Sequence, residues 1–231
     1  MTIPLRSVST ATCATLLSGI LFCLIVARFL FADGSIREGL LYISESGGKY
    51  PLLPIFAWCC SFGGISLGFI IICYTKIIET MEDPPPNLPF YVKSIRVLAY
   101  IGGAGLTVLG NVSVFDHFYI HSGAAQVFFI ATLANAILIL RISQHQHKNL
   151  DVYYIKYRRL IVYSLPFFIF IYLCLPYIFS NIPILVQIAI VGQYLSVGSL
   201  IVFFYSLRLE FENKVVGVLE GINDDYNKVD L

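Results

Sequence analysis

The chain has 231 residues, of which 58% are hydrophobic and only 13% are charged. A soluble domain carries roughly 25% charged residues, so this composition is typical of a membrane protein and leaves no room for a separate soluble domain. The net charge of +1 argues against nucleic acid as a partner, because phosphate binding needs a concentrated basic surface.

Long apolar runs follow one another along the chain. A hydrocarbon core about 30 Å thick needs roughly 20 apolar residues per helical crossing. The expected spans cover residues of about 8–31, 52–74, 92–114, 118–140, 160–179 and 184–207, and a polar tail follows over 208–231. The runs are apolar on all sides rather than alternating, which favours helices over membrane β-strands. We therefore predict an all-α fold, a polytopic bundle of about six transmembrane helices with short loops, forming a single transmembrane domain over 1–231.

The predicted connections also follow from the sequence. The first run is too long for the core of a cleaved signal peptide, so we expect it to be retained. A proline-rich stretch over 83–89 forbids helix after the second span. Only 115–117 separate the third and fourth spans, which must therefore be adjacent and antiparallel. A polar loop is expected over 141–159, and a tight turn over 181–183.

Small residues lie within several of these runs. The pair Gly64 and Gly68 has the spacing of a helix-dimerisation motif, although packing within one chain is the favoured interpretation. The cysteines all lie in apolar stretches, as expected of small buried residues rather than a disulfide framework or a metal site. They are Cys13, Cys23, Cys59, Cys60, Cys73 and Cys174.

One side of the predicted bundle carries most of the Lys and Arg residues. They are Arg6, Lys76, Lys93, Arg96, Arg141, Lys148, Lys156, Arg158, Arg159, Arg208, Lys214 and Lys228. The other side carries only Arg37 and Lys49, with Arg28 near the end of the first span. Because short cytosolic loops are enriched in Lys and Arg, we expect both termini in the cytosol. The loops around 36–50, 111–119 and 181–183 then lie on the luminal or extracellular side.

The densest polar cluster is Asp116, His117 and His121, at the non-cytosolic start of the fourth span. The two histidines are spaced i, i+4 on one helix face, which suits zinc, but no third ligand is evident and we expect no metal and no cofactor. Interfacial histidines bonded to neighbouring loops are the favoured interpretation. In a lipid-processing site, His121 with Asp116 would be the candidate pair, because a carboxylate can poise an imidazole as a general base.

Other polar residues have structural and functional interpretations. Asn111 begins an N-glycosylation pattern but lies very close to the end of a span, so we doubt its modification. Asn135, Gln187 and Gln193 are expected to face the bundle interior, where they either line a pathway or bond between helices. No acidic or basic residue stands mid-span, which argues against a proton-coupled transporter or a channel but leaves a neutral lipid route open.

The predicted cytosolic side offers two interaction surfaces. The basic residues over 156–159, with Arg141 and Lys148, either attract anionic lipid headgroups or simply set the topology. In the tail, Tyr226 and Val229 form a Tyr-x-x-apolar pattern of the kind that cytosolic sorting adaptors read. We expect membrane lipids and cytosolic proteins, sorting adaptors among them, as partners.

Several stretches in order resemble one family. They are Tyr42-Ile43-Ser44-Glu45-Ser46-Gly47 before Pro51 and Ile55-Phe56, then Gly110-Asn111 and Phe115, then His121 followed by Gly123 and Ala125. The chain resembles the damage-regulated autophagy modulator (DRAM) proteins of the DRAM/FRAG/SFK superfamily over nearly its whole length. The residues that match the family motif are Tyr42, Ile43, Ser44, Gly47, Asn111, His121 and Gly123. The chain departs from the family pattern at two places. It has Ser122 where members often have Asp, and Gln193-Tyr194 where the family has an acidic-aromatic pair.

The resemblance implies a lysosomal or endosomal multi-pass protein that modulates autophagy through non-catalytic membrane and protein interactions. The wider superfamily includes proteins of GPI-anchor lipid remodelling and phosphoinositide regulation. An alternative is therefore a lipid-remodelling enzyme, or its accessory factor, acting at the luminal face.

Overall fold

The structure, a computed structural model, describes residues 2–31, 39–81, 83–146, 153–178, 181–211 and 215–217. Six helices in this part of the chain are long and apolar enough to cross a membrane. They are α1 (Leu5–Leu30), α3 (Leu53–Ile78), α4 (Leu88–Asn111), α5 (Phe118–Gln146), α6 (Tyr153–Ile178) and α7 (Pro183–Ser206). The expected all-α polytopic bundle is thereby confirmed.

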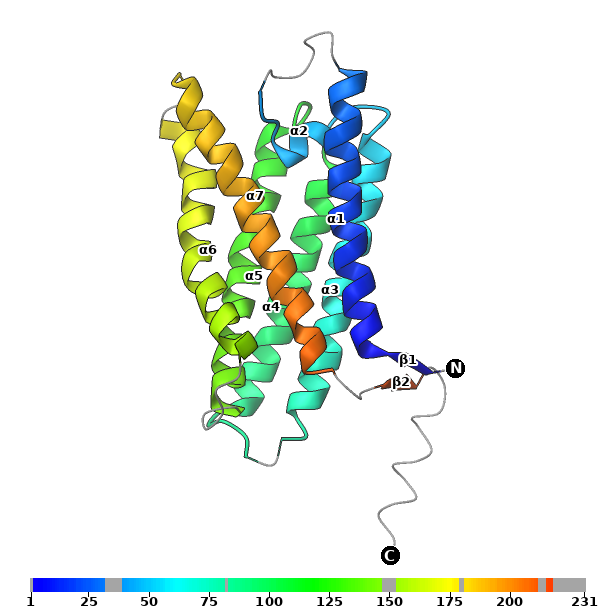
Figure 1. Cartoon of the computed structure of the whole chain (residues 1–231), viewed down its shortest axis with the longest axis vertical. Helices are drawn as coiled ribbons and strands as arrows, with labels where there is room; N and C mark the ends of the chain where they lie inside the picture. The colour runs from blue at the N-terminus through cyan, green and yellow to red at the C-terminus, as the bar shows by residue number, and fades with distance from the viewer. Residues whose placement is uncertain are drawn as a thin grey trace, which may run out of the picture.

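Three kinds of short element complete the described chain. Helix α2 (Ile43–Gly47) lies between α1 and α3, and a 3₁₀ turn (Leu207–Leu209) follows α7. Strands β1 (Thr2–Pro4) and β2 (Val215–Gly217) pair antiparallel and bring the described ends of the chain together. We call the end of the bundle that holds α2 the α2 end, and the end that holds β1 and β2 the terminal end (Figure 1).

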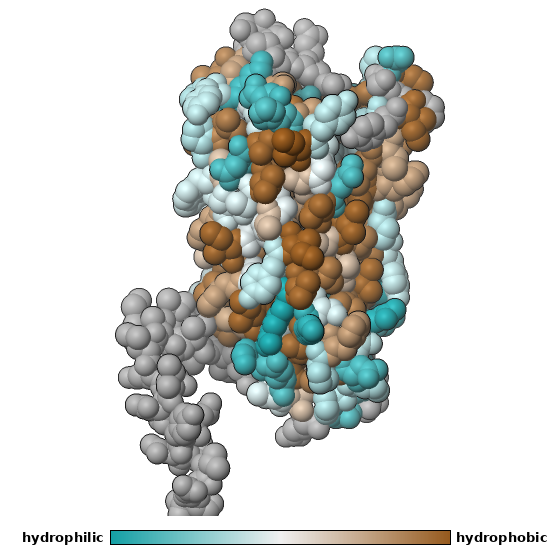
Figure 2. Space-filling model, turned by 180° about the vertical axis from the view of Figure 1, so that it is seen from behind, coloured by the Kyte–Doolittle hydropathy of each residue, from teal (hydrophilic) through white to brown (hydrophobic). Residues whose placement is uncertain are grey.

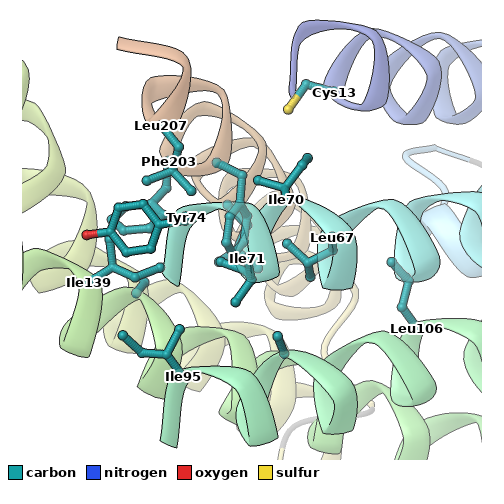
Figure 3. Packing of buried hydrophobic residues seen from close by; sticks show 14 of the residues in the cluster. Cys13, Leu67, Ile70, Ile71, Tyr74, Ile95, Leu106, Ile139, Phe203 and Leu207 are labelled. Atoms are coloured by element: carbon teal, nitrogen blue, oxygen red, sulfur yellow. The ribbon is translucent and has the colours of Figure 1, made fainter. Parts of the chain in front are cut away.

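The long helices form a closed bundle (Figure 1). Consecutive pairs pack together from α3 to α7, and α1 closes the ring because it contacts both α3 and α7. Buried side chains of α1, α3, α4, α5 and α7 meet in the interior, where Ile70, Ile71 and Tyr74 of α3 are among the least exposed residues (Figure 3). The α2 segment covers one end of this core and contacts α1 and α3.

The outer surface of the bundle is apolar around its middle. Ile65, Ile130 and Phe170 expose 72%, 61% and 57% of their surface. Hydrophobic residues dominate the middle of the surface in Figure 2, and hydrophilic residues gather toward the two ends. Such a band matches what contact with lipid chains requires.

Helices α5 and α6 are longer than their apolar runs. α5 continues to Gln146 and α6 already begins at Tyr153. The expected polar loop over 141–159 is therefore wrong for 141–146 and 153–159, which are helical. Residues 147–152 lie outside the described residues. The physical reason is that Lys and Arg are good helix formers whose heads reach the interface at a helix end. A drop in hydropathy marks the membrane boundary, not the end of the helix.

Helices α3 and α4 approach each other closely at two glycines. A Cβ atom added to Gly64 would lie 2.5 Å from the carbonyl oxygen of Gly103, whereas a Cβ on Gly68 would meet nothing within 4 Å. Gly64 therefore serves packing within the chain, as expected. Cys13, Cys23, Cys59 and Cys60 are buried, Cys73 and Cys174 are half-buried, and all are free of disulfides.

Candidate functional site

The segment that leads into α2 is held by polar side chains of α7. The Oε1 atom of Gln193 accepts the Ile43 N–H at 2.8 Å. The Tyr194 hydroxyl donates to the Leu41 carbonyl at 2.7 Å. Six residues before Gln193 in α7, the Oε1 atom of Gln187 accepts the Leu40 N–H at 3.0 Å. Gln187 and Gln193, expected either to line a pathway or to bond between helices, thus fasten this segment to the bundle.

Helix α2 is also fixed from its other sides. Its Glu45 carboxylate accepts the Tyr42 N–H at 2.9 Å, which satisfies a donor at the start of the helix. Gly47 packs directly on Phe56, since an added Cβ would lie 2.2 Å from that ring. The Ser113 hydroxyl donates to the Gly48 carbonyl at 2.9 Å and so ties α2 to the turn between α4 and α5.

A cavity of about 340 Å³ opens beside α2, and we call it the α2 cavity. Its walls come from the α2 segment, the α4–α5 turn, α5, α6 and α7. The lining residues are Tyr42, Ser44, Glu45, Val114, Phe115, Phe118, His121, Ser122, Tyr172, Leu173, Pro176 and Val186. The structure therefore brings three family-motif residues, Tyr42, Ser44 and His121, to one cavity.

His121 is the most constrained polar residue of this cavity. Its side chain is only 3% exposed, and its Nδ1 atom lies 2.7 Å from the Val112 carbonyl oxygen. A carbonyl oxygen can only accept a hydrogen bond, so Nδ1 carries the proton. Nε2 has no hydrogen-bond partner among the described residues. The neutral ring therefore keeps a lone pair on Nε2 that no described residue uses.

The rest of the predicted cluster lies elsewhere. Asp116 and His117 are exposed, and neither belongs to the lining of the α2 cavity. The predicted His121–Asp116 pair is not formed, because Val112 occupies Nδ1 and Nε2 bonds to no described residue. The i, i+4 spacing is helical, since His121 N–H donates to the His117 carbonyl at 3.0 Å. However, His117 precedes α5 and faces outward while His121 is covered by neighbouring elements.

The remaining motif residues have local roles. The Asn111 amide donates to the Ser61 hydroxyl at 2.9 Å and to the Thr107 carbonyl at 2.8 Å, and so links α4 to α3. A Cβ atom on Gly123 would meet nothing within 4 Å.

Among the described residues, no group of three or more His, Cys, Asp or Glu could hold a metal ion. Tyr226 and Val229 lie outside the described residues.

A buried ion pair at the terminal end was missed by the sequence analysis. Arg158 in α6 is fully buried and pairs with Glu210, which follows the 3₁₀ turn. Arg158 also donates to the Ser206 hydroxyl at 2.7 Å and to the Ser143 hydroxyl at 2.9 Å. Its guanidinium lies over the Tyr154 ring, 4.8 Å from the centroid. Of the two interpretations of the basic stretch, attraction of anionic lipid does not apply to Arg158, because helices enclose this side chain.

The sequence did contain a signal for this burial. Ile155, Val162 and Leu165 are all buried, and they stand three, four and seven residues from Arg158. That is the spacing of the inward face of a helix. Within the stretch 156–159, Lys156 and Arg159 are exposed and remain available at the surface.

Comparisons with known proteins identify the family. No curated protein and no solved structure matches the chain. A protein-family model described as the Frag1/DRAM/Sfk1/Cwh43P N-terminal domain matches residues 4–214, which include every long helix and the α2 segment. The chain therefore belongs to the Frag1/DRAM/Sfk1/Cwh43P family of multi-pass membrane proteins.

Proposed function

We propose that this protein is a non-catalytic modulator of autophagy and lysosome function in lysosomal or endosomal membranes, and that its α2 cavity binds a membrane lipid. The observation that carries the proposal is the cavity itself. Tyr42, Ser44 and His121, which carry the resemblance to the DRAM proteins, line this one space. A concave site with mostly apolar walls and a few convergent polar groups is the usual form of a small-molecule site.

The orientation of the bundle supports a luminal position for the cavity. Nine of the described Lys and Arg residues lie at the terminal end, namely Arg6, Lys76, Lys93, Arg96, Arg141, Lys156, Arg158, Arg159 and Arg208. Only Arg28 and Lys49 lie toward the α2 end. An excess of positive charge favours the cytosolic side. The α2 end then faces the lumen, and both termini lie in the cytosol.

A binding role fits the polar groups of the cavity better than catalysis does. General base catalysis by histidine works best when a carboxylate orients the ring and stabilises the imidazolium. In this cavity a backbone carbonyl, that of Val112, holds Nδ1 of His121. The carbonyl orients the ring but supplies no full negative charge. The arrangement is suited to hold a ligand hydroxyl at Nε2.

The cytosolic face would carry the regulatory contacts. Lys156 and Arg159 are exposed at the start of α6 and can attract anionic headgroups or acidic partner proteins. The tail pattern at Tyr226 and Val229 would bind sorting adaptors and direct the protein to endosomes and lysosomes. The two proposals can be tested separately. The tail pattern concerns where the protein is located, and the exposed basic residues concern its activity at that location.

The test is carried out in cells that lack the endogenous protein. We would express the tagged wild type, a variant lacking 223–231, Tyr226→Ala and His121→Ala. Each is imaged against lysosomal, Golgi and plasma-membrane markers, and autophagic turnover is measured. The proposal expects lysosomal signal and restored turnover for the wild type, mislocalisation for both tail variants, and correct localisation with reduced turnover for His121→Ala. Wild-type protein confined to the Golgi or plasma membrane would contradict it.

The second candidate is a lipid-remodelling enzyme or accessory factor of GPI-anchor or phosphoinositide chemistry. It is favoured by the Nε2 atom of His121, which lacks a described partner, on a residue that lines the α2 cavity. Quantitative lipid mass spectrometry on the same cells separates the two. An enzyme requires the His121→Ala variant to accumulate an unprocessed lipid, whereas a binding protein leaves lipid composition unchanged.

A further inference from the structure

The chain segment that follows α7 is built into the terminal end of the bundle. Leu207, in the 3₁₀ turn, and Phe211, just after that turn, are fully buried and belong to the hydrophobic core. The Glu210 side chain beside them is only 6% exposed. The 3₁₀ turn contacts α1 as well as α7. We call residues 207–211 the tail root. Because these side chains are buried, the tail root is part of the folded bundle.

The tail root holds the terminal-end half of α6 through one side chain. Glu210 pairs with Arg158 of α6, and its carboxylate also accepts the Ser143 hydroxyl of α5 at 3.0 Å. Arg158 in turn donates to Ser143 and to Ser206, the last residue of α7. Arg158 therefore joins α6 to α5, to α7 and to the tail root. Among these four side chains, only Glu210 carries the negative charge that compensates the guanidinium.

The other contacts of this half of α6 are apolar. Ile155, Val162 and Leu165 are buried on its inward face, and α6 is the least buried of the six described spans. In a membrane, lipid chains are as apolar as a neighbouring helix, so burial of such side chains supplies little attraction between helices. The polar contacts of Arg158 therefore contribute a large share of what keeps this half of α6 on its neighbours.

A proline divides α6 into two halves. Pro166 lies inside the helix and has no N–H, so it cannot donate to the Val162 carbonyl one turn earlier. Helices bend most readily at such positions. Tyr153 precedes Pro166 by 13 residues, and at about 1.5 Å per residue a change of about 20° in the bend moves Tyr153 by about 7 Å. The half that carries Arg158 can therefore move while the other half stays packed.

We propose that the tail root is a latch for α6. With Glu210 seated against Arg158, the terminal-end half of α6 is held on α5 and α7. When a protein that binds the tail draws Glu210 away, the buried charge of Arg158 is left uncompensated, which is strongly unfavourable. This half of α6 then swings outward about Pro166 and carries Arg158 toward the water at the terminal end.

The latch rests on the proposed function only in that the tail binds proteins. It is independent of lipid binding in the α2 cavity, and it gives contacts with the tail an effect on the shape of the bundle. The experiment below uses neither a lipid ligand nor an adaptor, so its failure leaves the proposed function intact.

The experiment measures distances between pairs of spin labels in full-length protein in lipid nanodiscs. One pair, Tyr153→Cys with Lys93→Cys, joins α6 and α4 at the terminal end. The other pair, Ile178→Cys with Trp58→Cys, joins α6 and α3 at the α2 end. All four side chains are exposed and can be labelled.

The native cysteines have to stay unlabelled. Cys73 and Cys174 are half-buried and are replaced by alanine in every sample. The other cysteines are buried and out of reach of the label. Mass spectrometry of each sample counts the labels, and the thermal transition of each variant is recorded.

Glu210→Gln removes the charge that compensates Arg158 but keeps the size of the side chain. We expect this variant to show a second population in which the Tyr153–Lys93 label distance is longer by about 7 Å. The label distance at the α2 end should equal that of the wild type.

Matched variants separate the charge from the packing. Arg158→Met combined with Glu210→Met removes both charges and should restore the wild-type distance. Arg159→Met changes an exposed neighbour and should leave the distance unchanged. Phe211→Ala loosens the tail root while both charges remain, and it should also populate the longer distance. Adding Pro166→Ala to Glu210→Gln should shorten the displacement.

Several results would overturn the latch. One is a wild-type distance distribution in both Glu210→Gln and Phe211→Ala, which also covers the case in which one of the two fails to fold. Another is a double Met variant as open as Glu210→Gln, because the charge of Arg158 would then not drive the motion. Lengthening of both label pairs would show a general loosening instead. A displacement that Pro166→Ala leaves unchanged would overturn the hinge. Wild-type protein confined to the Golgi, in contrast, contradicts the proposed function and leaves the latch standing.

Discussion

The side-chain oxygen of Gln193 accepts the backbone N–H of Ile43 at 2.8 Å and thereby joins α7 to the first turn of α2 across 150 residues of chain. The resemblance to the DRAM proteins implies an acidic residue at the position of Gln193. An amide oxygen accepts an N–H as a carboxylate oxygen does, so the substitution keeps this bond while it removes a charge from the buried position. The departure from the family pattern is therefore compatible with the same anchoring role.

Replacing Gln193 tests this anchor. Gln193→Leu leaves the Ile43 N–H buried without a partner, which should destabilise the fold by about 1–3 kcal/mol. Gln193→Glu retains an acceptor and should cost less. The measurements are the thermal transition in detergent micelles and hydrogen exchange of the α2 amides. Equal protection of the Ile43 amide in the Leu variant and the wild type would show that the bond does not hold α2.

Two motif glycines should respond in opposite ways to alanine. Gly47→Ala places a Cβ atom 2.2 Å from the Phe56 ring, which forces α2 away from α3 and should cost about 1–3 kcal/mol. Gly123→Ala meets nothing within 4 Å and lies in α5, where alanine is the better helix former by about 1 kcal/mol. Thermal unfolding of both variants in the same detergent is the comparison. A stabilised Gly47→Ala variant would contradict the packing described.

The Arg158–Glu210 pair makes a third prediction. Arg158→Met leaves a buried carboxylate without its partner and should destabilise the protein by about 3–5 kcal/mol. The double variant Arg158→Met with Glu210→Met removes both charges and should recover most of that loss, because buried pairs are often replaceable by apolar residues. Arg159→Met changes an exposed neighbour and serves as the control. A double variant no more stable than Arg158→Met would disprove the coupling between the two residues.

Glycine packing between α3 and α4 gives a fourth prediction. Gly64→Leu would drive a side chain into the backbone of α4 at Gly103, whereas Gly68→Leu points into open space. We expect the first variant to lose folded yield and the second to remain folded. Size-exclusion chromatography with light scattering provides both readouts. A Gly68→Leu variant that changes oligomeric state would reassign that residue to an interface between copies.

Hydropathy predicted the bundle well and the helix ends poorly. Long runs that are apolar on every side admit only spanning helices, so the crossings follow from composition. The extensions of α5 to Gln146 and of α6 back to Tyr153 do not follow from composition, because charged residues at an interface leave a helix intact. Polar composition alone therefore places Arg158 in a loop, although the apolar residues Ile155, Val162 and Leu165 stand at helical spacing from it in the sequence.

The α2 cavity shows what local sequence patterns cannot predict. His117 and His121 are equivalent by spacing, yet one is exposed and the other is buried. The difference depends on what covers α5, and the covering elements come from the α2 segment, α6 and α7. Such contacts join residues far apart in the chain. The sequence indicated which residues matched a family, but only the fold brought Tyr42, Ser44 and His121 to one cavity.

Native mass spectrometry of the protein after incubation with endolysosomal lipids tests non-catalytic lipid binding in the α2 cavity most directly. Wild-type protein would be compared with Ser122→Trp, which fills the cavity, and with Ile130→Trp, a lipid-facing control on the same helix. We predict that the wild type and Ile130→Trp retain a bound lipid that is recovered with unchanged mass, and that Ser122→Trp loses it. Recovery of a chemically altered lipid, or equal retention by Ser122→Trp, would contradict the account.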